Sequence, residues 1–272
     1  MRVLFIGDVY GAPGVSAVKS FLRSARASFD FVIANGENCA GGFGITRAHF
    51  RALRDAGVDV VTLGNHTFDQ PEAAQLLEET PRLVRPLTYP RGTPGVGFVT
   101  LPARDGSRIT VGQVMGRLFM EAMDDPFEAA DAIVEAAGPD EPVIVEVHAE
   151  ATSEKKVLGY HLEGRASAVI GTHTHVQTAD EALYQGTAWI TDVGMTGVEH
   201  SSIGMRFEEV HHRMRTKQPR RFKPAVGTAT LCAVALTLEG RRARSIERLR
   251  WRADDLADDA VQDSHALHGE RT

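Results

Sequence analysis

The chain is poor in cysteine, and this excludes one common way of stabilising a secreted protein. Its 272 residues include only Cys39 and Cys232, too few for a disulfide framework or a cysteine-rich structural zinc site. A chain of this length can bury a substantial hydrophobic core without covalent links. The sequence therefore indicates a reducing compartment, and we expect a cytoplasmic protein.

Long apolar runs and an excess of positive charge are also missing. No stretch approaches the roughly 20 apolar residues that a membrane-spanning helix needs. The first apolar run, residues 3–6, is too short for a secretory signal and suits a buried strand. A formal net charge of −6 argues against broad nucleic-acid binding, although it is compatible with a local phosphate site. We expect no membrane partner.

What is present is a repeated order of apolar strand, polar turn and helix. Three such units begin with the strands 3–6, 31–34 and 58–63. We expect Thr46 to cap the second helix and Asp69 to begin the third. This order is typical of an α/β domain with a mainly parallel sheet, in which ligands gather at the carboxyl ends of the strands.

The second half of the chain is less regular. A hairpin is predicted through Asp105 and Gly106, and residues 211–223 are predicted to form a basic loop. Two further strands are predicted at 228–238 and 245–251. We expect one domain over residues 1–253, followed by an acidic C-terminal tail over 254–272.

Two histidines one residue apart, His173 and His175, follow the predicted strand 168–170. Neutral imidazole is the commonest protein metal ligand, and this spacing lets both rings face one crevice. An isolated pair of this kind is more often a solvated or capping turn. The rest of the chain favours the metal interpretation, because other predicted strand ends carry the same kinds of ligand atom.

These other residues share a position at or just after the end of an apolar strand. They are Asp8, Glu37, Asn38, Asn65, His66 and His148. Singly, each has an ordinary alternative: Asp8 could cap a helix, and His148 could be a hydrogen-bonded core residue. Together, carboxylate, amide and imidazole exceed the needs of one catalytic metal. They suit two metals that share a bridging carboxylate, as in hydrolases of phosphate esters.

Taken in their order along the chain, the motifs resemble those of the calcineurin-like metallophosphoesterases. The matching segments are Asp8, residues 35–38, residues 64–66, His148 and residues 171–175. The Asn-Gly-Glu-Asn run and the run from Gly64 to Asp69 resemble in particular the YmdB-like branch, a bacterial group associated with cyclic-nucleotide phosphodiesterase activity. The resemblance implies a single metallophosphoesterase domain with an α/β/β/α sandwich, in which two mixed β-sheets are flanked by helices.

The resemblance also implies a set of ligands for two divalent or trivalent metal ions. The first ion would bind Asp8, Glu37, Asn38 and His175, and the second would bind Glu37, Asn65, His148 and His173. Iron or manganese suits this oxygen-rich set best, and zinc also fits. A hydroxide bridging the metals would attack phosphorus, while His66 would stay off the metals and donate a proton to the leaving oxygen.

The sequence departs from the common superfamily pattern at three places. Tyr10 replaces a histidine of the first motif, and Asn38 could supply the oxygen that Tyr10 does not. Glu37 stands where an aspartate is usual. Thr67 follows His66, with the acid coming later as Asp69, which leaves the orienting partner of His66 open.

We therefore expect a metal-dependent phosphodiesterase acting on small phosphodiesters, with 2′,3′- or 3′,5′-cyclic nucleotides as the first candidates. Two alternatives remain open. One is a phosphomonoesterase or 5′-nucleotidase that uses the same site. The other is a regulatory, RNA-associated binding protein with a vestigial metal site. A homo-oligomer is compatible with the sequence.

Overall fold

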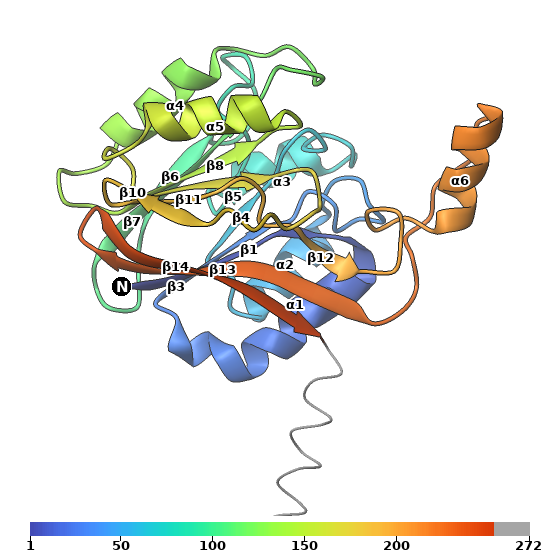
Figure 1. The fold of residues 1–272 in the computed structure, drawn as a ribbon, viewed down its shortest axis with the longest axis horizontal. Helices are drawn as coiled ribbons and strands as arrows, with labels where there is room; N and C mark the ends of the chain where they lie inside the picture. The colour runs from blue at the N-terminus through green and yellow to red at the C-terminus, as the bar shows by residue number, and fades with distance from the viewer. Residues whose placement is uncertain (253–272) are drawn as a thin grey trace, which may run out of the picture.

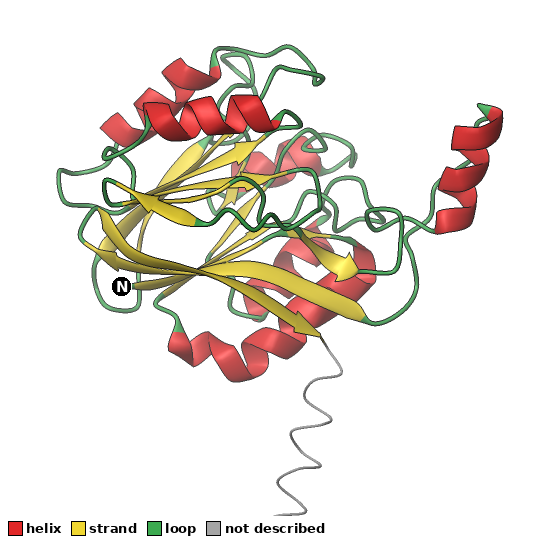
Figure 2. Ribbon diagram, in the orientation of Figure 1, coloured by secondary structure: helices red, strands yellow, loops and turns green. Residues whose placement is uncertain are grey.

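The computed structural model describes residues 1–252 and contains two mixed β-sheets packed face to face (Figures 1 and 2). The eight-stranded sheet has the order β2 (Asp8–Val9), β12 (Met195–Val198), β13 (Ala229–Glu239), β1 (Arg2–Ile6), β3 (Phe31–Asn35), β4 (Val60–Thr62) and β5 (Leu83–Val84), with β14 (Arg242–Arg252) paired to β13. The six-stranded sheet has the order β10 (Ala182–Tyr184), β11 (Thr187–Ile190), β9 (Ala168–Thr172), β8 (Val143–His148), β7 (Arg108–Met115) and β6 (Phe98–Pro102).

Helices cover the outer face of each sheet. They are α1 (Gly11–Ala25), the short 3₁₀ helix η1 (Arg26–Ser28), α2 (Arg47–Asp55), α3 (Ala73–Glu79), α4 (Pro126–Glu135), α5 (Thr152–His161) and α6 (Phe207–Thr216). Helices α1 and α2 lie on one side and α4 and α5 on the other, whereas α6 projects from the body (Figure 1). The expected α/β/β/α sandwich is confirmed. The predicted tail, 254–272, lies outside the described residues.

The hydrophobic core has three layers, which follow from the alternation of side chains along the strands. The layer between the two sheets includes Phe5, Ile33 and Ile144. A second layer joins the first sheet to α1, α2 and α3, and a third joins the six-stranded sheet to α4 and α5. Because strands β3, β4, β8 and β9 are buried on both faces, they consist mainly of apolar residues, with Glu146 as the charged exception in β8.

The strands that lead to the candidate ligands are parallel within each sheet. Strands β1, β3, β4 and β5 run in one direction in the first sheet, and β7, β8, β9 and β11 are parallel in the second. Their carboxyl ends therefore deliver the following turns to a shared edge of the sandwich. The sequence-based expectation that ligands gather at strand ends depends on this arrangement.

Two predictions about local structure were wrong. The third helix begins at Ala73 and not at Asp69, whose carboxylate instead accepts a hydrogen bond from His66. Residues 211–216 of the predicted basic loop belong to α6, which places Glu208 and Glu209 in its first turn and Arg213 and Arg215 in its last. Both charge placements complement the helix dipole.

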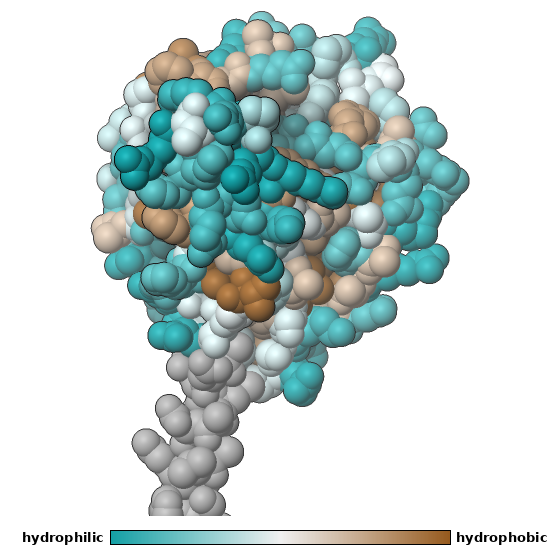
Figure 3. Space-filling view, turned by 90° about the vertical axis from the view of Figure 1, so that its right-hand side faces the viewer, coloured by the Kyte–Doolittle hydropathy of each residue, from teal (hydrophilic) through white to brown (hydrophobic). Residues whose placement is uncertain are grey.

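Four short strands, β2, β5, β10 and β12, were not predicted. Each has only two to four residues and is defined by its partner strand. No helix in residues 1–252 is long and apolar enough to cross a membrane. The side from which α6 projects is mainly hydrophilic, with small and separate hydrophobic patches (Figure 3).

The packing of α5 on β11 gives a test of the third core layer. A Cβ atom on Gly159 would lie 2.2 Å from Cζ3 of Trp189. Gly159→Ala should therefore lower the free energy of unfolding by about 1–3 kcal/mol from overpacking, although alanine gains up to about 1 kcal/mol in an open helix. Val157→Ala, at an exposed position of the same helix, should change it by less than about 0.5 kcal/mol. Equal stability of the two variants in urea unfolding would contradict this packing.

Candidate metal centre

The structure brings all seven predicted metal ligands and His66 to the shared edge of the two sheets. Glu37 and Asn38 follow β3, Asn65 and His66 follow β4, His148 ends β8, and His173 and His175 follow β9, while Asp8 begins β2. The alternative interpretation of Asp8 as a helix cap does not hold, because Tyr10 is the N-cap residue of α1 and no side chain caps that helix.

One half of the site is centred on His148. Its Nε2 atom lies 3.0 Å from Oε1 of Glu37 and 2.9 Å from Oδ1 of Asn65. Nδ1 of His173 lies 3.1 Å from the same nitrogen. Ligand atoms of Glu37, His148 and His173 all lie within 4.8 Å of one another, which is close enough for one cation.

The other half of the site is a cluster of hydrogen-bond acceptors. Oδ1 of Asp8 is buried and has no hydrogen-bond partner, and Nε2 of His175 lies 4.0 Å away. Oδ1 of Asn38 lies 3.2 Å from the same nitrogen, while the Asn38 amide group donates to the carbonyl of Gly42. Nδ1 of His175 donates to the carbonyl of Ile203. Nε2 of His175 therefore faces two side-chain oxygens, and burial raises the pKa of the Asp8 carboxyl, which disfavours its charged form when no metal is bound.

This arrangement fits a cation, because a buried carboxylate oxygen without a partner is costly and a metal ion would pair it. Gly64 gives a second indication. A Cβ atom there would lie 2.4 Å from Oε2 of Glu37 and 2.5 Å from Nε2 of His148. Glycine at this position therefore leaves room for the ligand atoms. At Gly7 and Gly36 the reason differs, because a Cβ atom would instead meet the carbonyl of Gly194 or the side chain of Val61.

The Glu37–His148 contact changes the pKa of both groups. Burial alone would raise the pKa of Glu37, but the charge and hydrogen bond of His148 lower it to about 2. Burial alone would lower the pKa of His148, but the Glu37 carboxylate raises it to about 9. In the metal-free protein at neutral pH, His148 is therefore an imidazolium paired with the Glu37 carboxylate.

A buried polar layer fixes the orientation of His148. Nδ1 of His148 lies 2.9 Å from Oγ1 of Thr172, whose hydroxyl donates to Oε1 of Glu146 at 2.7 Å. Because that hydroxyl proton is used, Thr172 accepts from Nδ1 and leaves Nε2 for the site. Asn35 donates to the same Glu146 oxygen and accepts from the backbone amide of Glu37. Burial raises the pKa of Glu146 to about 7.

His173 is held as a neutral ring. Its Nε2 atom lies 3.1 Å from a carboxylate oxygen of Glu150, so Nδ1 presents a lone pair toward His148. Burial, followed by the positive charge of His148, lowers the pKa of His173 to about 3. A neutral imidazole whose far nitrogen donates to a carboxylate is the usual form of a metal-ligating histidine.

Both histidines of this turn have an unusual backbone. The φ angle is 97° at His173 and 66° at His175, a region that non-glycine residues seldom adopt. Each such residue costs on the order of 1–3 kcal/mol and persists only where its surroundings fix it. The backbone strain therefore occurs at two of the candidate ligands themselves.

His66 lies beside these ligands and has a carboxylate partner. Its Nδ1 atom is 2.7 Å from Oδ2 of Asp69, and its backbone amide donates to Glu37. The ring of Phe43 meets it edge to face, with centroids 5.1 Å apart. Asp69 is therefore the orienting partner that the sequence left open. In the sequence, the signal for this partner was the position of Asp69 three residues after His66.

Tyr10 does not replace the missing histidine as a ligand. Burial raises the pKa of its hydroxyl to about 12, so it stays protonated at neutral pH. The Tyr10 ring instead packs edge to face on His175, with centroids 5.7 Å apart.

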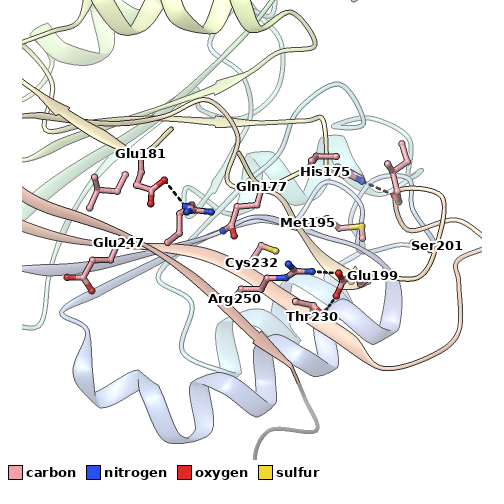
Figure 4. Close-up of a pocket in the computed structure, with 15 residues that line it drawn as sticks. His175, Gln177, Glu181, Met195, Glu199, Ser201, Thr230, Cys232, Glu247 and Arg250 are labelled. Carbon is pink, nitrogen blue, oxygen red and sulfur yellow. Dashed lines mark hydrogen bonds and ion pairs between the residues drawn. The ribbon is translucent and has the colours of Figure 1, made fainter. Parts of the chain in front are cut away.

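Four of the seven proposed ligands, Glu37, Asn38, His173 and His175, line a cavity of about 230 Å³, whose walls also include His66. A larger cavity of about 710 Å³ shares His175 and Ile203 with it (Figure 4). In that larger cavity Arg250 pairs with Glu199, and Arg248 pairs with Glu181. The smaller cavity is the candidate reaction site, because four of the proposed ligands line it and only His175 lines the larger one.

The fold and the site together define a protein of the metallophosphoesterase type. The model of the YmdB-like protein family matches residues 4–249, and the chain belongs to this family. It is 44% identical over 262 residues to the 2′,3′-cyclic-nucleotide 2′-phosphodiesterase of Bacillus subtilis (strain 168), covering 94% of this chain and 99% of the relative.

Two solved structures are similar along almost their whole length. A hypothetical protein from Thermus thermophilus has 51% identity and a TM-score of 0.89, covering 93% of this chain and 99% of that one. A phosphatase from Mycoplasma pneumoniae has 29% identity and a TM-score of 0.86, covering 93% of both chains. These relatives confirm the expectation of a phosphoesterase enzyme.

The raised pKa of His148 predicts that metal binding releases a proton. Below about pH 9 its Nε2 atom carries a proton that a metal ion must displace, so protons compete with metal. Calorimetric titration of metal-free protein with Mn²⁺ at pH 7 should release about one proton at this histidine, and apparent affinity should rise with pH toward about 9. Binding heats that do not depend on the ionisation enthalpy of the buffer would contradict this protonation state.

Proposed function

We propose that the protein is a two-metal-dependent phosphodiesterase that hydrolyses small phosphodiesters, with cyclic nucleotides as its substrate class. The observation that carries the proposal is the convergence of carboxylate, amide and imidazole atoms around Glu37, including the buried and unpartnered Oδ1 atom of Asp8. Such a cluster suits cations and does not stabilise a protein without them. His66 adjoins the cluster and lines the same cavity.

The proposed ligands divide into two sets that share Glu37. One ion is held by Asp8, Glu37, Asn38 and His175, and the other by Glu37, Asn65, His148 and His173. Bound ions supply the positive charge that activates water and offsets the charge of a phosphate group. Carboxylate and amide oxygens make up at least half of each set, so we favour iron or manganese over zinc.

His66 acts on the substrate in this proposal. Asp69 accepts from its Nδ1 atom, which fixes the ring and leaves Nε2 available to the cavity. From there the imidazolium form of His66, protonated at both nitrogens, donates its Nε2 proton to the leaving oxygen of the diester and becomes neutral. Phe43 packs against the ring and limits its rotation.

The cavity favours a small substrate. Its volume of about 230 Å³ lies below the roughly 300–1,000 Å³ of pockets for larger ligands. The Bacillus subtilis relative is named for 2′,3′-cyclic nucleotides, and we therefore place these ahead of the 3′,5′-cyclic nucleotides.

Two alternatives predict different behaviour. The Mycoplasma pneumoniae relative is described as a phosphatase, which keeps a phosphomonoesterase or 5′-nucleotidase in consideration. Comparing monoester and diester substrates at matched concentration separates these, and a strong monoester preference would favour the alternative. An RNA-associated protein with a vestigial site would have no use for the His66–Asp69 pair, and it would bind metal without turnover.

Removing the imidazole of His66 tests its role. His66→Ala should lower kcat for bis-p-nitrophenyl phosphate by about 100- to 10,000-fold, since general acid catalysis contributes this much. Metal content, measured on the same preparation, should stay at the wild-type level. His49→Ala is the matched control, because that imidazole contacts Thr46 at the start of α2 and no proposed ligand.

Two results would count against this role. If His66→Ala lost metal in step with activity, His66 would be a ligand and not a proton donor. If it kept full activity, the leaving oxygen would obtain its proton elsewhere. The kcat of Asp69→Asn should lie between those of His66→Ala and the wild type, because this variant keeps the imidazole and weakens its orientation.

A further inference from the structure

A buried ion pair lies directly behind the turn that carries His173 and His175. Nζ of Lys155, on α5, lies 2.7 Å from Oδ2 of Asp192, and the two side chains are 0% and 1% exposed. A pair buried this completely gains little stability of its own, because desolvation offsets the attraction. Stability therefore does not explain why this ion pair is buried here.

The carboxylate of Asp192 is bonded to the middle of the ligand turn. Oδ2 accepts from the backbone amide of Thr174 at 3.0 Å and from the Thr174 hydroxyl at 2.8 Å. Thr174 is the residue between the two histidines with positive φ angles. Asp192 thus holds the turn at its centre through two donors, while Lys155 balances the charge.

The same carboxylate also reaches the strand that carries Asp8. Oδ1 of Asp192 accepts from the amide of Gly194 at 2.8 Å. The carbonyl of Gly194 in turn accepts from the amide of Asp8 at 3.1 Å. A side chain on Gly7 could not fit there, because its Cβ would lie 1.8 Å from that carbonyl oxygen. Asp192 is therefore connected to three of the seven proposed ligands.

We infer that Asp192, with Lys155 as its counterion, is a positioning residue that holds the His173–His175 turn in its metal-binding conformation before any metal binds. The inference rests on the proposed metal site and goes beyond it, because neither residue is a ligand. Partners behind the ligands commonly alter metal affinity when they are removed. Thr174 transmits the effect and offers the mildest substitution.

Thr174→Val removes the hydroxyl donor and keeps the backbone bond and the side-chain volume. It should weaken Mn²⁺ binding by about 10- to 100-fold in competition with a chromogenic chelator. Thr174→Ser keeps the hydroxyl and should restore affinity close to the wild type. Thr187→Val is the matched control: it removes a buried threonine hydroxyl that donates to the carbonyl of Ala166, at the far end of β11 from the site.

A second readout does not depend on metal. In metal-free protein, hydrogen exchange of the segment 172–178 should be faster in Thr174→Val than in the wild type, and unchanged in Thr187→Val. If all variants bound Mn²⁺ equally and exchanged equally in this segment, the positioning role would be wrong. If the wild type bound no Mn²⁺ while Thr174→Val still loosened the turn, the proposed metal site would fail and the structural hold of Asp192 would stand.

Discussion

The site depends on one constraint: several oxygen and nitrogen atoms with lone pairs lie close together in the protein interior. Oxygen atoms of Asp8 and Asn38 and a nitrogen of His175 face one another, and the buried Asp8 oxygen has no hydrogen-bond partner. In the other half, the proton on His148 compensates for the Glu37 carboxylate when no metal is bound. In one half of the site the proton on His148 thus balances the charge, whereas in the other half burial raises the pKa of Asp8, so a cation there would stabilise its carboxylate.

The surrounding fold maintains this arrangement with buried polar groups behind it. Glu146 holds Thr172 and Asn35, which orient His148 and the backbone of Glu37. Asp192 holds the turn between β9 and β11. Such groups cost free energy unless they are fully bonded, so they are best explained by the geometry that they impose. The two sheets supply the frame, because each contributes parallel strands that end at the same edge.

Much of the fold and most of the candidate ligands could be predicted from the sequence, because the ligands follow strands that are recognisable as apolar runs. The convergence of Asp8, Glu37, Asn65 and His148 was predicted from the strand ends, whereas the four-layer fold was predicted from the family resemblance. The supporting residues could not be predicted in this way. Lys155 has the pattern of a surface helix residue, and Glu146 interrupts an apolar strand without indicating its partner. Their contacts are set by packing between elements far apart in the chain.

The most direct test of the two-metal site is metal analysis of freshly purified protein, combined with hydrolysis of bis-p-nitrophenyl phosphate with and without added manganese. We expect about two metal ions per chain and diester cleavage, with activity lost on chelation and restored by manganese. Protein that contains no metal, and that manganese neither binds nor activates, would contradict the central claim. The strand-end residues would then form a polar network without a catalytic centre.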